Sequence, residues 1–223
     1  MTPSDHGIAA ALVRGAGELL LRVRNRDFAD AAARKAAGDA EAHRYLTDRL
    51  APHRPEDAVL SEEGADEPGR TDWAVHVALW ERGDLVAGAV ALPAEATTLS
   101  TADVAPAPSR ADGPMRLAVS RSRPPVFVTD LAERLGAELL PMGSAGVKAM
   151  SVVRGIADAY VHGGGQYEWD SAAPVAVARA AGLHASRLDG SALQYNQPNP
   201  YLPDLLICRP ELHGRLLAAL ADR

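Results

Sequence analysis

The chain has 223 residues and a formal net charge of −6, with 47% hydrophobic and 23% charged residues, as in an ordinary soluble globular protein. The negative charge excludes the global basic surface that binding to a nucleic acid duplex requires. There is no hydrophobic run of the roughly twenty residues that a membrane span needs, no signal-peptide pattern, and only one cysteine, Cys208, so we expect a cytoplasmic protein.

The first half of the chain, residues 1–114, is predicted to hold two helices followed by a meander of strands. Asp5 is a plausible N-cap for the first helix, and the second helix fits residues 39–50. Side chains alternate over residues 71–80, which places Trp73, Val75, Val77 and Leu79 on one face of a strand. We expect further strands over residues 58–63, 85–93 and 97–104, the second of them forming a hairpin with residues 71–80.

Residues 105–114 are the best candidate for a linker or exposed loop, and the pattern changes after them. In residues 115–223, strands alternate with helices, which favours a layered α/β half. The expected strands cover residues 115–120, 137–144, 156–162 and 204–209, and the expected helices cover residues 126–136, 145–155, 169–182 and 211–223.

A candidate acid stands where a glycine-rich run gives way to an alanine-rich helix. Asp170 lies at the start of that helix, in the stretch "QYEWDSAAP". An aspartate here caps the helix, because its carboxylate accepts backbone hydrogen bonds at the positive helix end. The triple glycine at residues 163–165 permits unusual backbone close to a ligand, so a ligand-binding role stays open beside capping.

The glycine-serine turn before the helix over residues 145–155 is a second candidate site. Free N–H groups at such a turn bind anions, and Lys148, one turn into the helix, adds positive charge. An ordinary capped helix with a solvated lysine explains the same residues. The stretch is not a phosphate-binding P-loop, because the Gly-Lys-Ser/Thr ending is absent.

Three other side chains suit a phosphate group. Arg121 and Arg123 follow the end of a strand, where a guanidinium suits phosphate recognition, although a solvated surface pair fits as well. His162 ends another strand and either meets a phosphate or stays in the core. The remaining histidines show no zinc-ligand spacing.

Three stretches together carry a resemblance to a known family. They are "VLSEEG" at residues 59–64, "GSAGVKAMSVVRGIADAYVH" at residues 143–162 and "EWDSAAPVAVARAAGLHASRLDG" at residues 168–190. The chain resembles the inositol monophosphatase superfamily over nearly its whole length, and within it the CysQ-type phosphatases. The resemblance implies an α/β fold with layered α-β-α-β-α order. It also implies Mg²⁺-dependent hydrolysis of 3′-phosphoadenosine 5′-phosphate to AMP, in sulfur assimilation.

The same resemblance implies roles for individual residues. Glu62 matches the first carboxylate of the family's E-E motif, a metal ligand that helps position the attacking water, and Glu63 matches the acid just outside the ligand set. Asp170 matches the metal-binding aspartate of the W-D motif, and Asp39 matches, more loosely, an acid linked to a further metal. The residues expected to contact substrate are Ser144, Lys148, Arg123 and His162. Carboxylate oxygens are the ligands that Mg²⁺ prefers.

One family motif is missing from the sequence. The family carries D-P-x-D-G-T soon after its E-E motif, and two of its acids bind metal while its threonine helps activate water. Here residues 61–66 run almost directly into residues 67–79, which match the family just past that motif. A strand and its turn, on the order of ten or more residues, are therefore absent. Asp66, Glu67 and Asp72 lie nearby, but the exacting geometry of Mg²⁺ makes them poor substitutes.

The expected function is therefore a Mg²⁺-dependent phosphatase for a small phosphorylated nucleotide or sugar phosphate. We expect no membrane or nucleic acid partner, and a homodimer is compatible with this function. Two alternatives stay open: inositol monophosphatase or fructose-1,6-bisphosphatase activity, and a non-catalytic remnant that lacks the missing motif. We also expect Glu62 and Asp170 to face one cleft, and the chain to bind Mg²⁺ weakly and to hydrolyse substrate poorly.

Overall fold

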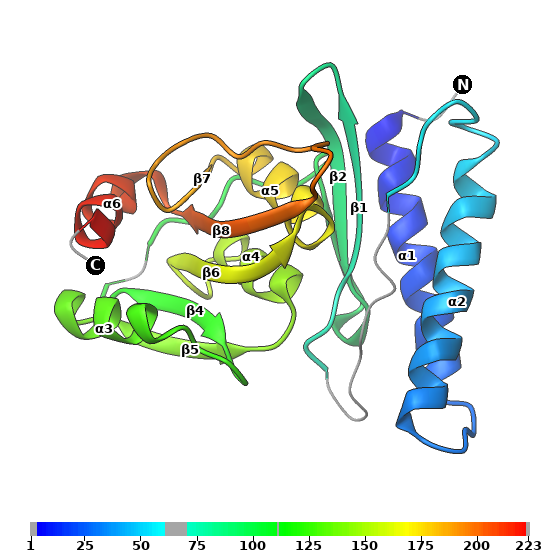
Figure 1. Cartoon of the computed structure of the whole chain (residues 1–223), viewed down its shortest axis with the longest axis horizontal. Coiled ribbons are helices and arrows are strands. Elements are labelled where there is room, and N and C mark those ends of the chain that lie inside the picture. The colour runs from blue at the N-terminus through cyan, green and yellow to red at the C-terminus, as the bar shows by residue number, and fades with distance from the viewer. Residues whose placement is uncertain (1–3, 61–70, 111, 222–223) are drawn as a thin grey trace.

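The computed structural model describes residues 4–60, 71–110 and 112–221. Its helices and sheets form five layers, in the order helices, sheet, helices, sheet, helices (Figure 1). This is the layered α-β-α-β-α arrangement predicted from the sequence. None of the helices in these residues is long and apolar enough to cross a lipid bilayer.

The first layer is the antiparallel pair α1 (Asp5–Arg24) and α2 (Ala31–Leu50). Ser4, rather than the predicted Asp5, caps α1 by accepting a hydrogen bond from the Gly7 N–H (3.2 Å). Helix α2 begins earlier than the predicted residue 39, because Asp30 caps it and the residues that follow are alanine-rich. Only α1 packs broadly on the neighbouring sheet, so α2 is the outermost element on this side.

The second layer is an antiparallel sheet with strand order β1-β2-β3. The predicted hairpin is confirmed, and its two-residue turn at Arg82 and Gly83 has positive φ at both positions, as tight hairpins require. The predicted strand at residues 58–63 is wrong over residues 58–60, which are irregular, and its remainder lies outside the described residues. The bounds are β1 (Val75–Glu81), β2 (Asp84–Leu92) and β3 (Thr97–Ser100), with a short 3₁₀ helix, η1 (Pro93–Glu95), between the last two.

The third layer contains α4 (Ala145–Val153) and α5 (Glu168–Ala180), which lie between the two sheets. Alternate residues of β2 face opposite layers: Ala89 and Ala91 pack with α1, whereas Val90 and Leu92 pack with α4 and α5. Helix α5 also carries a proline, Pro174, in its interior. The β1–β3 sheet lies within residues 1–114 and the next sheet within residues 115–223, and one hydrophobic cluster contains side chains from both ranges. The division into two halves stays a prediction.

The fourth layer is a mixed sheet with strand order β5-β4-β6-β8-β7. Strand β4 runs parallel to β5 and β6, while β8 runs antiparallel to β6 and β7. Strand β7 was not predicted, because three residues are too few to show alternation. The bounds are β4 (Arg116–Ser120), β5 (Glu138–Met142), β6 (Ala159–Tyr167), β7 (His184–Ser186) and β8 (Tyr201–Cys208).

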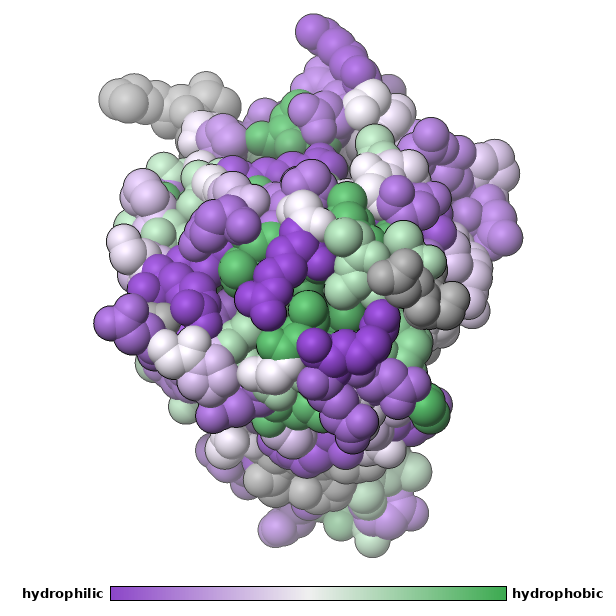
Figure 2. All heavy atoms as spheres, turned by 90° about the vertical axis from the view of Figure 1, so that its left-hand side faces the viewer, coloured by the Kyte–Doolittle hydropathy of each residue, from purple (hydrophilic) through white to green (hydrophobic). Residues whose placement is uncertain are grey.

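The fifth layer is formed by α3 (Val126–Leu135) and α6 (His213–Ala221), with the 3₁₀ helix η2 (Pro210–Leu212) leading into α6. Figure 2 shows this side of the molecule, where apolar residues gather near the centre between hydrophilic ones. A hollow of about 340 Å³ beside α6 is lined by Leu188, Asp189, Leu217, Leu220 and Ala221. It lies on the outer layer and contains none of the predicted site residues.

Candidate active site

Helix α5 begins directly where strand β6 ends, and Asp170 lies at this junction. The Asp170 carboxylate accepts a hydrogen bond from the Tyr167 N–H (2.8 Å), so it closes the first turn of the helix. The predicted N-cap role is therefore wrong: Tyr167 is the N-cap residue, and Asp170, the third residue of the helix, completes a capping box. The hydrogen bond from Tyr167 uses one carboxylate oxygen of Asp170 and leaves the second for a ligand.

The glycines before this junction shape the end of β6. Gly164 and Gly165 have φ values of 82° and 80°, in the left-handed region that favours glycine. The pairing of β6 with β8 shifts register between Gly163 and Gln166. A Cβ atom at Gly163 would lie 2.7 Å from the Phe127 ring of α3, so only glycine fits there. These residues confirm the predicted unusual backbone next to Asp170.

The turn that opens α4 is bound by an acid that lies three residues before β1. Ser144 caps α4 by accepting a hydrogen bond from the Gly146 N–H (3.2 Å). The preceding Gly143 N–H donates to the Asp72 carboxylate (2.5 Å), and Asp72 also pairs with Arg121 (2.6 Å). Three N–H groups of the predicted anion-binding turn are thus engaged within the protein: Gly143 by the Asp72 carboxylate, Ser144 by the Asp72 carbonyl oxygen (3.3 Å) and Gly146 by the Ser144 hydroxyl. With Gly143 and Arg121 as partners of its carboxylate, Asp72 is poorly placed to replace a metal ligand.

A histidine from β1 joins the beginnings of α4 and α5. His76 Nδ1 lies 3.3 Å from the Trp169 carbonyl oxygen of α5. Its Nε2 faces Gly146 of α4, where an added Cβ would come within 2.0 Å. Burial lowers the pKa of His76, so the ring is neutral at pH 7. We did not predict this residue, although it interrupts the apolar side of β1 that faces α4 and α5.

Lys148 lies inside the molecule. Its side chain is 5% exposed, its Nζ donates to the Gly143 carbonyl oxygen, and the ammonium lies 5.4 Å from the centre of the Tyr160 ring. The alternative of a solvated lysine is therefore wrong. A buried cation beneath the Gly143 turn makes the beginning of α4 more positive.

His162 and Gln166 add polar atoms to the same region. Burial lowers the pKa of His162, and the nearby Lys148 charge lowers it further. Gln166 is 5% exposed and donates from Nε2 to the Tyr160 hydroxyl (2.7 Å). Among the described residues, His76 Nε2, His162 Nε2, Gln166 Oε1 and Trp169 Nε1 are buried and lack hydrogen-bond partners. Such atoms gathered around one junction are typical of a ligand-binding region.

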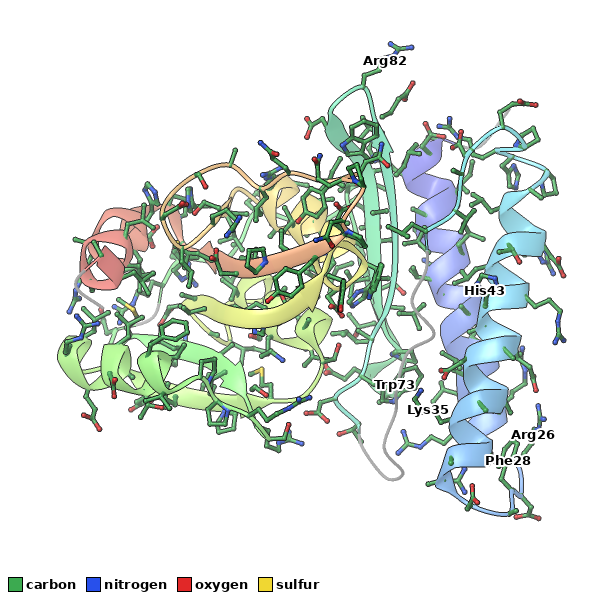
Figure 3. The ribbon with its side chains drawn as sticks, viewed as in Figure 1. Arg26, Phe28, Lys35, His43, Trp73 and Arg82 are labelled. Atoms are coloured by element: carbon green, nitrogen blue, oxygen red, sulfur yellow. The ribbon has the colours of Figure 1, made fainter. Side chains whose placement is uncertain are left out.

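The other predicted residues lie elsewhere or outside the described residues. Asp39 is on α2 and pairs with Lys35 (3.2 Å), which Figure 3 labels on that outermost helix. Arg123 is exposed beside Arg121 at the end of β4. Glu62 and Glu63 fall in the stretch 61–70, outside the described residues.

The fit of these residues to a metal ion is incomplete. In residues 4–60, 71–110 and 112–221, no group of three or more His, Cys, Asp or Glu side chains is placed to hold a metal. Asp170 supplies one carboxylate, and Asp72 is engaged by Gly143 and Arg121. The described residues therefore do not form a complete metal site around Asp170.

The chain matches a known family over most of its length. A family model described as "Inositol monophosphatase family" matches residues 68–223, which is more than half of the chain. The chain belongs to the inositol monophosphatase family. Phosphatases of this family are generally metal-dependent. The family, fold and phosphatase class predicted from the sequence are confirmed.

Relatives within the family carry a more specific name. A 3′-phosphoadenosine 5′-phosphate phosphatase of Mycobacterium bovis is 46% identical over 239 residues, covering 93% of this chain and 90% of that protein. The protein of the same name from Mycobacterium leprae is 43% identical over 255 residues, covering 98% and 94%. The crystal structure of CysQ from Bacteroides thetaiotaomicron superposes with a TM-score of 0.78 at 21% identity, covering 91% of this chain and 96% of that chain.

The Mycobacterium bovis relative is longer than this chain within the matched region. The match spans 239 residues, but 93% of a 223-residue chain is about 207 residues. About 32 aligned positions therefore have no residue here. This shortfall agrees with the absence of the D-P-x-D-G-T stretch from the sequence.

Proposed function

We propose that this chain is a Mg²⁺-dependent phosphatase that removes the 3′-phosphate of 3′-phosphoadenosine 5′-phosphate. The observation that carries the proposal is the 46% identity, over 93% of the chain, to a protein of that name. In the reaction, water attacks phosphorus and the bond from phosphorus to the 3′ oxygen breaks. The products are AMP and inorganic phosphate.

We assign Glu62 and Asp170 as metal ligands, with Glu63 supporting them. Asp39, on α2 and paired with Lys35 (3.2 Å), is assigned to a further metal, apart from Asp170. A Mg²⁺ ion bound by Glu62 and Asp170 would neutralise negative charge on the phosphate. The support is the match of these acids to the family's motifs and the free carboxylate oxygen of Asp170 at the start of α5. That Glu62 and Asp170 face one cleft stays a prediction, as do the cytoplasmic location, the homodimer and the absence of membrane and nucleic acid partners.

The proposed substrate contacts differ in kind. Arg123 is exposed and suits direct pairing with a phosphate oxygen. Lys148 is buried, so it acts through its charge beneath the Ser144 turn rather than by reaching into solvent. His162 is neutral at pH 7 and keeps Nε2 without a partner among the described residues, which suits a hydrogen bond to substrate.

Two other functions remain as alternatives. Inositol 1-phosphate and fructose 1,6-bisphosphate are substrates of the same family, and the catalytic apparatus alone does not separate them. A non-catalytic role is favoured by the missing D-P-x-D-G-T stretch. In that case the chain binds the nucleotide and releases no phosphate.

Phosphate release measured on two substrates tests the proposal. We expect kcat/KM for 3′-phosphoadenosine 5′-phosphate to exceed that for inositol 1-phosphate, with both rates requiring Mg²⁺. A preference for inositol 1-phosphate rejects the nucleotide assignment. Tight nucleotide binding without any phosphate release, even at high protein concentration, favours the non-catalytic alternative.

A further inference from the structure

Three aromatic side chains gather at the junction of β6 and α5, and we call them the aromatic platform: Tyr167, Trp169 and Tyr201. The rings of Tyr167 and Trp169 are stacked, with centroids 4.7 Å apart and an angle of 10° between their planes. Tyr201 meets Tyr167 edge to face, with centroids 5.8 Å apart and an angle of 81°. The chain has only ten Phe, Trp and Tyr residues, so three in one cluster is a marked concentration.

The platform is fixed by the backbone around it. Tyr167 of β6 and Tyr201 of β8 are direct partners across the antiparallel pair, a position where aromatic side chains stabilise each other. The Tyr201 hydroxyl also accepts a hydrogen bond from the Gly165 N–H (3.2 Å). The rings are therefore held in place before any ligand arrives, which reduces the entropy lost on binding.

The platform stands next to the candidate catalytic acid. Tyr167 donates its N–H to the Asp170 carboxylate (2.8 Å), and Trp169 is the residue directly before Asp170. Tyr167 and Asp170 are three residues apart, within about one helical turn of 5.4 Å. A ligand that rests on the rings thus has its other end close to Asp170.

The exposure of the platform indicates that it binds a ligand and does not serve packing alone. Tyr201 and Tyr167 remain 43% and 40% exposed, which makes them the two most exposed aromatic side chains in the described part of the chain. Rings that packing alone requires are normally covered by other side chains. Here two fixed rings keep part of their surface open to solvent.

We propose that the aromatic platform stacks the nucleobase of the substrate and so selects a nucleotide over a sugar phosphate. This inference rests on the proposed function and adds the residues that give it specificity. A planar base has a face that stacks on aromatic rings, which inositol and fructose lack. Stacking uses the face of the base and not its edge, so the platform distinguishes the presence of a base rather than adenine from guanine.

The test compares two ligands that differ only in the base. Affinities of 3′-phosphoadenosine 5′-phosphate and of ribose 3,5-bisphosphate are measured by isothermal titration calorimetry without added metal, so that turnover does not interfere. We expect the unmodified chain to bind the nucleotide more tightly. We expect Tyr201→Ala to weaken nucleotide binding about tenfold, or about 1.4 kcal/mol, and to leave ribose bisphosphate binding within about twofold.

Three variants control for the fold and for the hydrogen bond. Tyr201→Phe keeps the ring and removes the hydroxyl that Gly165 binds, so nucleotide affinity should stay near that of the unmodified chain. Tyr201→Leu keeps apolar volume without a ring and should behave like Tyr201→Ala, which preserves the test if the alanine variant unfolds. Trp80→Ala removes another exposed aromatic ring near the Arg82 tip of the β1–β2 hairpin (Figure 3). That tip meets the far end of α5, where Arg179 lies 3.9 Å from Asp84, so binding should not change.

The platform proposal is overturned if Tyr201→Ala lowers the affinity for both ligands equally. It is also overturned if the unmodified chain binds both ligands with equal affinity. The proposed function fails by a different result. If the chain binds the nucleotide selectively through Tyr201 but releases no phosphate from it, even with the missing strand restored, the platform proposal stands and the proposed phosphatase activity is rejected. If the chain hydrolyses both ligands at equal rates, with or without the Tyr201 ring, the phosphatase activity stands and the platform proposal is rejected.

Discussion

The two sheets contribute to the candidate site in different ways. The β4–β8 sheet leads through β6 into the glycine bend and Asp170, and its helices bring Ser144 and Lys148 to the same region. The β1–β3 sheet supplies His76 and Asp72, which hold the beginnings of α4 and α5 in place. The acidic motif that the family carries soon before β1 is absent from the sequence. The candidate site therefore draws its described residues from both sheets, and the acids missing from the sequence belong to the side of the β1–β3 sheet.

Restoring the missing acids is expected to give the largest effect. A family-like strand with Asp-Pro-Leu-Asp-Gly-Thr, inserted between Asp66 and Glu67, should raise Mg²⁺-dependent phosphate release about 10²–10⁴-fold, the usual contribution of an oriented general base. An insertion of equal length with Asn-Pro-Leu-Asn-Gly-Ala controls for the added strand. If the unmodified chain already turns over as fast as the restored one, other residues, such as Asp66 or Glu67, supply the ligands.

The role of Asp170 is tested in the restored chain. Asp170→Asn keeps an oxygen that accepts the Tyr167 N–H but removes the charge, so the fold should be retained. Phosphate release should fall at least about 100-fold, because a metal contributes several kcal/mol of charge stabilisation and each 1.36 kcal/mol is worth about tenfold in rate. Asp130→Asn, at an exposed position on α3, is the matched control. Equal rates for the two variants contradict a metal-binding role for Asp170.

The link between the two sheets is tested through Gly143. A Cβ atom at this position would lie 2.6 Å from the Asp72 carboxylate oxygen and 2.8 Å from the Asp72 carbonyl oxygen. Gly143→Ala should therefore lower the free energy of unfolding by about 1–3 kcal/mol, as overpacking does. Gly214→Ala in α6 meets no atom within 4 Å and should be neutral or slightly stabilising. Urea unfolding at pH 7 measures both, and equal stability of the two variants contradicts the tight Asp72 contact.

The smallest expected effect concerns two histidines far from β1. The rings of His184 and His213 are 3.8 Å apart, and burial lowers the pKa of His184, with the His213 and Arg179 charges lowering it further. His184 therefore binds a proton more readily in the unfolded chain than in the folded one. The free energy of unfolding keeps its full contribution from neutral His184 above about pH 6.5 and falls as the pH drops below that value. His184→Gln should lose less stability between pH 7.5 and 5.5 than the unmodified chain. His53→Gln, at an exposed turn, should follow the unmodified chain, and a parallel loss in all three proteins contradicts the assignment.

Much of the fold follows from local patterns in the sequence. The β1–β2 hairpin shows side-chain alternation on both sides of a tight turn, and α3 to α6 each show apolar spacing with recognisable ends. The predicted second helix, residues 39–50, starts too late, because Asp30 caps the helix and the alanine-rich residues after it are already helical. Helix propensity alone does not fix the first residue of a helix, because the capping residue also has to be identified.

The candidate site was less accessible from sequence, because its contacts join distant segments. Asp72 meets a turn 71 residues away, and His76 meets a carbonyl group 93 residues away. Lys148 was read as a surface residue or a substrate contact because helical spacing does not reveal that α4 lies between two layers. The place of Asp170 near the start of a helix could be predicted because its motif is local. The partners that hold it in place depend on tertiary packing.

The proline inside α5 leaves one main-chain carbonyl group of the helix without its usual hydrogen-bond donor. Pro174 has no N–H, so the main-chain carbonyl four residues earlier loses its usual helical donor. That carbonyl belongs to Asp170. The residue that offers a free carboxylate oxygen therefore also presents a main-chain oxygen without a helical partner. That main-chain oxygen points along the helix axis toward Pro174 and away from the β6–α5 junction. At the junction Asp170 therefore offers a ligand its carboxylate alone, and a helix that lacks one internal hydrogen bond so close to its first turn is free to bend there.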